Sequence, residues 1–390
     1  MAFRSLPLPL FLSGFLTCGA AGATPELTPA QRALIFGEPA AVVTSEKIVR
    51  IPLEGTDHQG YYKCPYVQVL INGQGPFTFL FDTGSSYTSI SSKVIEAAHI
   101  QVTADRGGYH DVLRVRKMRL GGLDISDLTA VRDDDFGVDG VFGFRAFGDM
   151  HLVFELAARQ LLVSPDPVLP AGGFELPFTL DHNVPIIPVS VGTAQVGTLL
   201  DTGDDAYSWE VRSGDLQGTK LAHPPRPADS VLNGARSSST YVSTLDGSVR
   251  LGPLTIEQAA VGINDALPVP DLGVDYLKDF NIEFDPKRMV ITFQPVTAGS
   301  GTHLHGNLTP GFRLKYDDKG TVSTVMPGLA ADQRGMRTGD RVLSIDGKPV
   351  TGLGPRSWDA LLAPAKPLTV RWVQADGKEH TDSFEVVEFR

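Results

Sequence analysis

Two copies of the tripeptide Asp-Thr-Gly stand where apolar runs end, in FLFDTGSS (79–86) and in TLLDTGDD (198–205). A carboxylate buried in such a run is costly unless it is hydrogen-bonded or a partner relieves its charge. If Asp82 and Asp201 face each other, they cannot both ionise easily, so they would share one proton. Such a pair can hold a water molecule between a general base and a general acid. The sequence therefore predicts that Asp82 and Asp201 form a catalytic pair.

The residues that follow each aspartate have tasks that this pairing requires. Gly84 and Gly203 would permit a tight turn and the close approach of the facing loop. The hydroxyls of Thr83 and Thr202 would form hydrogen bonds across the axis between the two loops. We expect these four residues to support the catalytic loops.

The two copies differ at the position after the glycine. Ser85 carries a hydroxyl that we expect to donate to the ionised form of Asp82 and so to favour ionisation. The second copy has Asp204, whose charge would disfavour ionisation of Asp201 and raise the pKa values of the pair. If Asp204 instead points into solvent, screening makes it nearly silent.

The similarity of the two copies extends well beyond the tripeptide. RLGGLDI (119–125) parallels RLGPLTI (250–256), and GVFGFRAFGDMHLVFE (140–155) parallels PDLGVDYLKDFNIEFD (270–285). These landmarks occur in the same order, which indicates that one β unit of about 120 residues was duplicated. Strand-like runs recur between turn residues, so the chain is expected to be mostly β. Two lobes related by a pseudo-twofold axis would bring the two aspartates together.

Together with the two Asp-Thr-Gly loops, each copy has an apolar-apolar-Gly element, which ends at Gly143 in the first copy and at Gly273 in the second. With these motifs, residues 46–296 resemble a bacterial, two-lobed, single-chain form of the pepsin and retropepsin type of aspartic protease. In that family the element passes behind the catalytic loop and supports it. Asp271 departs from the pattern because it occupies an apolar slot. The resemblance implies peptide-bond hydrolysis by an activated water, without a covalent intermediate, a metal or a cofactor.

The resemblance also implies a flap, a β-hairpin that closes over the substrate. The candidate in the first lobe is the stretch 106–109, with Tyr109 as the flap tyrosine, and an ordinary turn residue is the alternative for Tyr109. The candidate in the second lobe is the stretch 233–241, with Tyr241 at its end.

A further module is expected after a polar linker at 296–306. Residues 304–390 resemble a PDZ domain of the bacterial kind, most specifically in PGLAADQRGMRTGDRVLSIDGKPV. In that family a Gly-Φ-Gly-Φ loop presents backbone N–H groups to the terminal carboxylate of a peptide, which adds as a strand. The corresponding residues are Gly311, Phe312, Arg313 and Leu314, with Arg313 where a second glycine is usual. Trp358, Leu361 and Leu362 would line the groove, although Leu361 and Leu362 are equally well explained as core residues.

Composition limits the class of protein. The chain has 390 residues, of which 42% are hydrophobic, and a formal net charge of −11. It can therefore bury the core of two or three domains. The acidic balance argues against nucleic acid, because binding phosphates requires clustered basic residues. The expected partners are peptide or protein substrates, bound by a monomer without a membrane span.

The N-terminus has the features of a secretory signal peptide. One basic residue, Arg4, precedes an apolar stretch at 6–16 and an Ala-Gly-Ala exit that ends at residue 23. We expect cleavage there and export to the periplasm or the exterior. Lipidation of Cys18 is the rival interpretation. Residues 24–45 are either a removable propeptide or a short surface helix.

The predicted chain organisation is a signal peptide (1–23), an N-terminal segment (24–45), a first protease lobe (46–165), a second protease lobe (174–296) and a PDZ-like module (304–390). The nine histidines are scattered, and the closest pair, His303 and His305, lies in the polar linker, so no metal site is expected. The predicted function is an aspartic endopeptidase whose module recruits substrates. The alternative is a catalytically inactive, exported, peptide-binding pseudoprotease.

Overall fold

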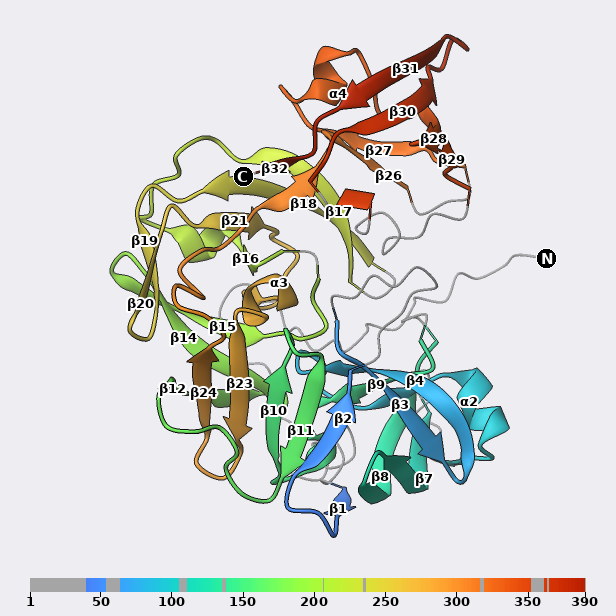
Figure 1. Ribbon diagram of the computed structural model, residues 1–390, viewed down its shortest axis with the longest axis vertical. Helices are drawn as coiled ribbons and strands as arrows, with labels where there is room; N and C mark the ends of the chain where they lie inside the picture. Colours follow the sequence, from blue (N-terminus) through green and yellow to red (C-terminus); the bar gives the residue numbers. More distant parts are fainter. Residues whose placement is uncertain are drawn as a thin grey trace, which may run out of the picture.

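The computed structural model describes residues 40–53, 64–104, 111–134, 138–205, 207–233, 236–315, 319–351, 361–362 and 365–389. Within these ranges the chain is mostly β, as the sequence predicts, with three large sheets and a C-terminal group of small ones (Figure 1). The predicted signal peptide, including Cys18, lies outside the described residues, and so does most of the segment 24–45. In the part that is described, no helix has the length and apolar character needed to cross a membrane.

The first lobe is built on an eight-stranded sheet in the order β1-β8-β5-β9-β4-β3-β7-β6. Its strands are β1 (Ala41–Val43), β3 (Tyr66–Ile71), β4 (Gln74–Asp82), β5 (Ser89–Ile90), β6 (Gln101–Ala104), β7 (Val112–Leu120), β8 (Leu123–Arg132) and β9 (Gly140–Gly143). Helix α2 (Ser92–Ala97) follows β5. Buried and exposed residues largely alternate along β7, as expected for a strand with one face on the core.

The second lobe is built on a ten-stranded sheet in the order β17-β18-β21-β16-β22-β15-β14-β19-β20, with β13 beside β14. Its strands are β13 (Thr179–Asp181), β14 (Val184–Val191), β15 (Ala194–Leu200), β16 (Trp209–Val211), β17 (Arg226–Asn233), β18 (Arg236–Thr244), β19 (Ser248–Leu251), β20 (Leu254–Glu257), β21 (Ala260–Ile263) and β22 (Asp271–Leu272). The 3₁₀ turn η2 (Ser213–Leu216) follows β16, and helix α3 (Val274–Leu277) follows β22.

The duplicated sequence folds into a duplicated sheet. The order β21-β16-β22-β15-β14-β19 in the second lobe corresponds to β8-β5-β9-β4-β3-β7 in the first. The two parallel pairings of the first lobe, β4 with β9 and β5 with β8, recur as β15 with β22 and β16 with β21. The two lobes therefore share one topology at their centres.

A six-stranded sheet joins the lobes, in the order β12-β24-β23-β10-β11-β2. Its strands are β2 (Val49–Pro52), β10 (His151–Glu155), β11 (Gln160–Ser164), β12 (Phe174–Pro177), β23 (Phe280–Asp285) and β24 (Val290–Pro295). The lobes meet where β10 pairs with β23, with Leu152 opposite Phe284. The 3₁₀ turn η1 (Phe144–Phe147) leads into β10. Backbone hydrogen bonds thus run without a break from one lobe to the other.

Aromatic side chains fill the space between the first lobe and this bridging sheet. The Phe81 ring lies 5.0 Å from that of Phe147 and 5.1 Å from that of Phe154. Phe154 in turn contacts Phe284 of the second lobe, with ring centroids 5.9 Å apart. These contacts anchor the end of β4 to both lobes, because Phe81 directly precedes Asp82.

The C-terminal module contains a four-stranded sheet, β29-β28-β30-β31, and two two-stranded sheets, β25-β32 and β26-β27. Its elements are β25 (Asn307–Thr309), β26 (Phe312–Leu314), β27 (Val322–Val325), α4 (Ala330–Gln333), β28 (Arg341–Ile345), β29 (Lys348–Pro349), β30 (Leu368–Val373), β31 (Glu379–Phe384) and β32 (Val387–Phe389). A separate hydrophobic core holds it together, with Phe312, Trp372 and Phe384 fully buried.

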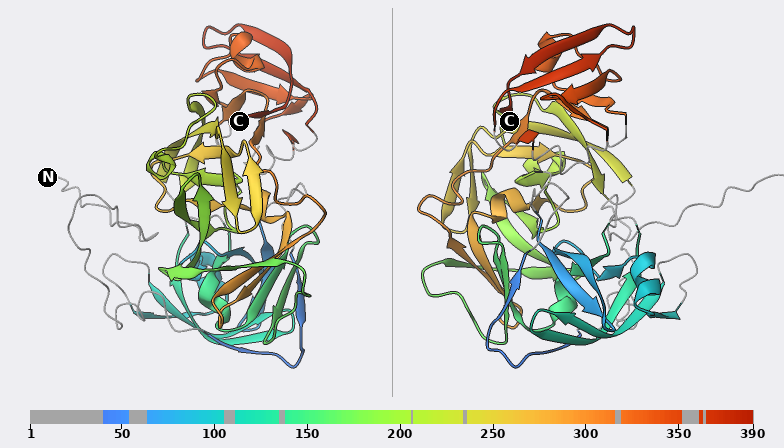
Figure 2. Two further views of the ribbon diagram at one scale, coloured as in Figure 1. Left: turned by 90° about the vertical axis from the view of Figure 1, so that its left-hand side faces the viewer. Right: turned by 45° about the vertical axis from the view of Figure 1, so that its right-hand side comes forward.

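The module packs against the β17–β18 hairpin of the second lobe (Figures 1 and 2). A small buried cluster, here called the junction cluster, joins Tyr207, Ala228 and Val242 of the lobe to Met326 and Phe389 of the module. The Arg226 guanidinium lies 5.9 Å from the centroid of the Phe389 ring. The module is therefore attached to the second lobe by side-chain packing as well as by the linker.

This packing predicts a difference between two residues of β32. Phe389 is 3% exposed and belongs to the junction cluster, whereas Val387 on the same strand is 38% exposed. Phe389→Ala should lower the free energy of unfolding by about 3–5 kcal/mol. Val387→Ala, the matched control, should change it by less than about 0.5 kcal/mol. Urea unfolding of the full chain, followed by tryptophan fluorescence, measures the free energy of unfolding of both variants. Equal effects of the two substitutions would contradict the packing of Phe389 in the junction cluster.

Candidate active site

Each Asp-Thr-Gly loop begins where a central strand of its lobe ends. Asp82 is the last residue of β4, and Asp201 directly follows β15. On one side each strand is bonded in parallel to the strand of the apolar-apolar-Gly element, with Leu80 opposite Val141 and Leu199 opposite Asp271. Both aspartates are thereby fixed at equivalent places in two rigid sheets.

The two loops meet face to face. A Cβ atom on Gly84 would lie 2.2 Å from Asp201 Oδ2, and a Cβ atom on Gly203 would lie 2.5 Å from Asp82 Cγ. A side chain at either glycine would therefore collide with the carboxyl group of the opposite lobe. The glycines allow the Asp82 and Asp201 carboxyl groups to come together at the pseudo-twofold axis.

The threonines bond across this axis. Thr83 Oγ1 donates to the Leu200 carbonyl and accepts the Thr202 N–H at 3.0 Å. In the symmetric arrangement, Thr202 Oγ1 donates to the Phe81 carbonyl at 2.7 Å and accepts the Thr83 N–H at 3.0 Å. Both threonines are almost fully buried. Four hydrogen bonds thus hold the loops in register.

Backbone N–H donors stabilise the ionised form of the two carboxyl groups, whereas burial destabilises it. The Gly84 N–H donates to Asp82 Oδ1 at 2.8 Å, and the Gly203 N–H donates to Asp201 Oδ1 at 2.7 Å. The Asp204 N–H also donates to Asp201 Oδ1, at 3.2 Å. Burial, followed by the charge of Asp201, raises the pKa of Asp82 well above its ordinary value. Burial also raises the pKa of Asp201, against the effect of its N–H donors.

The Ser85 hydroxyl does not donate to Asp82, so this expectation from the sequence is wrong. It donates to the Tyr87 carbonyl at 2.8 Å, because the loop turns back on itself at this point. Backbone N–H groups make the local hydrogen bonds to Asp82 instead. The hydroxyl therefore stabilises the loop and not the carboxylate.

The glycines of the two apolar-apolar-Gly elements lie directly behind the loops. A Cβ atom on Gly143 would lie 2.7 Å from the Tyr87 carbonyl, and one on Gly273 would lie 2.4 Å from the Tyr207 carbonyl. Only a residue without a side chain fits at either place. The family resemblance implied this position for both glycines.

The structure describes only part of the predicted flaps and peptide groove. Tyr109 and Trp358 lie outside the described residues. Tyr241 is on β18, which pairs with β17 in a hairpin, and it is 42% exposed. Leu362 is buried in the core of the module, so the interpretation of Leu362 as a core residue is the one that the structure supports.

The predicted carboxylate-binding loop of the module has its own internal bonds. The Gly311 N–H donates to Thr309 Oγ1 at 3.1 Å, so this donor is already used. Phe312 is fully buried in the module core and Arg313 is 7% exposed. Among the described residues, β26, which ends at Leu314, is paired with β27.

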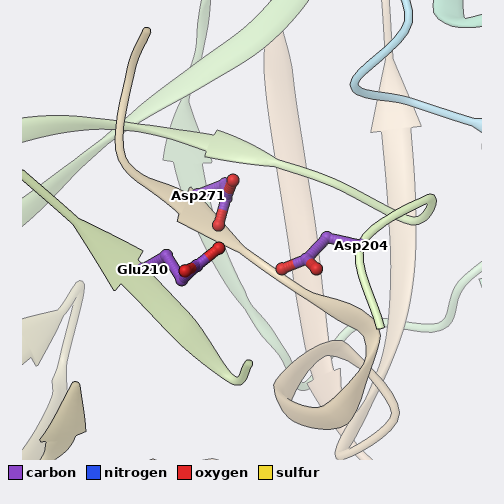
Figure 3. Close-up of side chains that lie close together, drawn as sticks. All are labelled: Asp204, Glu210 and Asp271. Atoms are coloured by element: carbon purple, nitrogen blue, oxygen red, sulfur yellow. The ribbon is translucent and has the colours of Figure 1, made fainter. Parts of the chain in front are cut away.

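Sequence reasoning missed two features beside the pair of aspartates. Cys64 is buried, its Sγ lies 3.5 Å from the Gly203 carbonyl, and burial raises the pKa of the thiol. Behind the second loop, carboxylate oxygens of Asp204, Glu210 and Asp271 all lie within 4.8 Å of one another (Figure 3). The signal for this acidic cluster was Asp271 in an apolar slot. Glu210 gave no signal, because only the fold brings β16 next to β22.

Two protein families match parts of the chain. The family described as "Aspartyl protease" matches residues 67–146, which include Asp82 and Gly143. The family described as "PDZ domain" matches residues 293–371. The second Asp-Thr-Gly loop lies outside both matches.

Curated relatives match shorter parts of the chain. The periplasmic serine endoprotease DegP of Salmonella typhimurium is 28% identical over 98 residues, covering 23% of this chain and 21% of DegP. DegP of Escherichia coli K12 is 23% identical over 133 residues, covering 32% and 28%. The periplasmic pH-dependent serine endoprotease DegQ of Escherichia coli K12 is 26% identical over 104 residues, covering 25% and 23%. The chain thus spans about a quarter of the length of these relatives.

These similarities support a protease that carries a PDZ domain. They name two catalytic types, because the family match is to aspartyl proteases and the relatives are serine endoproteases. The type has to be argued from the chemistry of the site.

The hydrogen bonds of the Thr83 hydroxyl predict that replacing this hydroxyl by a methyl group destabilises the protein. Thr83→Val leaves the Leu200 carbonyl and the Thr202 N–H buried without this partner, and each costs about 1–3 kcal/mol. We expect the free energy of unfolding to fall by about 2–5 kcal/mol in urea titrations. Thr255→Val on the exposed side of β20 is the control and should be nearly silent. A silent Thr83→Val would show that the hydroxyl does not bridge the lobes.

Proposed function

We propose that the protein is an aspartic endopeptidase in which a water molecule bound between Asp82 and Asp201 attacks the peptide bond. The observation that carries this proposal is the meeting of two buried carboxyl groups, each packed against the glycine of the opposite loop. The loops are held across the axis by the threonine hydrogen bonds. Structural carboxylates rarely require such an arrangement, whereas general acid–base catalysis does.

The two carboxyl groups have different roles in the proposed mechanism. We assign the shared proton to Asp82 and the ionised form to Asp201, which accepts the Gly203 and Asp204 N–H bonds as a carboxylate. Asp201 takes a proton from water as the water oxygen bonds to the peptide carbon. Asp82 gives its proton to the carbonyl oxygen, which yields a neutral tetrahedral diol. Asp82 then takes a proton back from this diol and Asp201 protonates the leaving nitrogen, so that the C–N bond breaks.

The serine alternative requires a hydroxyl next to a general base, most often a histidine. In the described part of the chain, no serine hydroxyl is hydrogen-bonded to an imidazole ring. Ser85, which is closest in sequence to Asp82, donates to a backbone carbonyl. Since the serine relatives share only about a quarter of their length with the chain, the aspartic mechanism has the stronger support.

The PDZ module would recruit peptide or protein substrates by strand addition. The added strand would lie beside β26, which begins directly after Gly311. A C-terminal carboxylate is the expected recognition element, held by the backbone near Phe312. The names of the relatives and the predicted signal peptide together favour a periplasmic location.

Removing either carboxylate tests the proposed mechanism. Asp82→Asn and Asp201→Asn should each lower the rate of cleavage of denatured protein by at least about 10³-fold, because an amide can neither take up nor relay the proton. Asp246→Asn, an exposed control, should leave the rate unchanged. A statine-type inhibitor should block the wild type and a serine-directed fluorophosphonate should not. Blockage by the fluorophosphonate alone would refute the aspartic mechanism.

The raised pKa values predict how activity depends on pH. The active pair holds one proton, which is lost as pH rises through the raised pKa of Asp82. The alkaline limb of kcat/KM should therefore lie above the ordinary aspartate range of about pH 4. By the same linkage, proton binding stabilises the folded state fully below about pH 3.9 and this stability is lost as pH rises. Asp82→Asn should accordingly gain stability relative to wild type between pH 4 and 8, and a constant difference would contradict the shift.

A further inference from the structure

The acidic cluster behind the second loop consists of one residue from each of three elements. Asp204 belongs to the loop after Asp-Thr-Gly, Glu210 to β16 and Asp271 to β22. Glu210 and Asp271 are directly opposite each other in the antiparallel pairing of β16 and β22. They are only 2% and 7% exposed. Figure 3 shows all three carboxyl groups converging on one another.

The first lobe provides an internal comparison. The Val274 N–H donates to the Asp204 carbonyl just as the Phe144 N–H donates to the Ser85 carbonyl, so Asp204 and Ser85 are equivalent. Asp271 is equivalent to Val141, because each lies opposite the residue two before the catalytic aspartate.

The same comparison applies to Glu210, which is opposite Asp271 as Ser89 is opposite Val141. Two serines and a valine therefore suffice where the second lobe has three acids. The fold does not require the acids for its geometry.

Three ionised carboxylates at these distances would repel one another strongly. Asp271 Oδ1 is buried, and no amide, hydroxyl or basic group among the described residues donates to it. Ionised carboxylates can only accept hydrogen bonds, so two that face each other need a proton between them. Burial, then the charges of Asp204, Glu210 and Asp201, raise the pKa of Asp271 well above its ordinary value. A side-chain hydrogen bond with Asp204 acts in the same direction.

In the part of the chain that the structure describes, the groups around the cluster do not supply a compensating charge to Asp271. The charge of Asp201, which follows β15, raises the pKa of Asp271 further, and the charge of Asp205 acts in the same direction on the thiol of Cys64. From β18, Thr240 Oγ1 donates to Glu210 Oε1 at 3.2 Å. On α3, Asp275 is paired with Lys278 at 3.0 Å and is therefore already neutralised.

We propose that Asp204, Glu210 and Asp271 share at least one proton at neutral pH and that this protonated cluster positions the second Asp-Thr-Gly loop. The link to the loop is Asp204, whose side chain enters the cluster while its N–H donates to Asp201 Oδ1. When the shared proton is lost, repulsion from Glu210 and Asp271 drives Asp204 away and weakens that bond. The three acids are positioning residues. The sharing of the proton does not depend on the proposed protease function, whereas the effect on Asp201 rests on it.

The first test measures stability and needs no activity. A cluster that binds its proton more tightly when folded stabilises the protein at low pH, and this stability is lost as pH rises through the raised pKa. We compare the Tm of the full chain from pH 4 to 8 with that of the triple variant Asp204→Ser, Glu210→Ser, Asp271→Val, which copies the first lobe. The Tm of the variant should rise relative to wild type as pH increases, by about 3–5 °C per unit of pKa shift that is removed.

The control removes three exposed carboxylates, through Glu96→Ser, Asp246→Ser and Glu257→Ser, and should not change the pH dependence of the Tm difference. Asp271→Asn, which resembles the protonated acid in shape, gives the same test if the triple variant does not fold. It too should gain stability relative to wild type as pH rises. A Tm difference that does not vary with pH, for whichever of the two variants folds, would overturn the proposal.

A second measurement distinguishes a proton from a metal ion. At pH 7, millimolar Ca²⁺ should leave the Tm of wild type and of Asp271→Asn equally unaffected. A Ca²⁺-dependent increase in wild type alone would show that the cluster binds a cation, and would overturn proton sharing.

The last measurement concerns the loop. In Asp204→Ser the alkaline limb of kcat/KM should move towards acid by about half to one pH unit, because the backbone N–H at this position keeps its bond to Asp201 Oδ1 when Glu210 and Asp271 lose their proton. An unchanged limb would overturn the positioning role. A wild type without protease activity would refute the proposed function and leave the stability result in force.

Discussion

The burial of two carboxyl groups at one point is the constraint on which the rest of the structure depends. Neither group could stay buried alone at low cost, and their closeness requires two lobes in fixed register. The glycines remove the steric barrier, and the threonine hydroxyls fix the register by bonding the chain of the opposite lobe. The bridging sheet gives this contact a rigid base, because β10 and β23 continue one hydrogen-bonded sheet through both lobes.

Much of this could be predicted from the sequence because duplication is visible in it. Two similar motifs in similar surroundings specify similar sheets, and the structure shows the same strand order around both. What the sequence did not specify are contacts between residues distant in the chain. The Ser85 hydroxyl had two possible acceptors, and the local turn favours the Tyr87 carbonyl over Asp82. Glu210 has the sequence surroundings of an ordinary polar residue, because its contact with Asp271 arises only from the pairing of β16 with β22.

The duplication also makes the asymmetry of the two loops informative. The second lobe has acids at all three positions where the first has Ser85, Ser89 and Val141. A departure at one position could be neutral drift, but three departures that meet in space are coupled by electrostatics. Asp271, in an apolar slot, and Asp204, in a serine slot, are far apart in the sequence. In space they are two members of one cluster.

The same loop is also in contact with the PDZ module. Tyr207 lies three residues beyond Asp204 and is buried in the junction cluster with Met326 and Phe389. Met326 directly follows β27, which pairs with β26. The junction cluster and the β26–β27 pairing therefore connect β26, beside which we propose that a peptide binds, to the loop that carries Asp201. The position of this loop is thus constrained from two sides, by the threonine hydrogen bonds to the first lobe and by the packing of Tyr207 against the module.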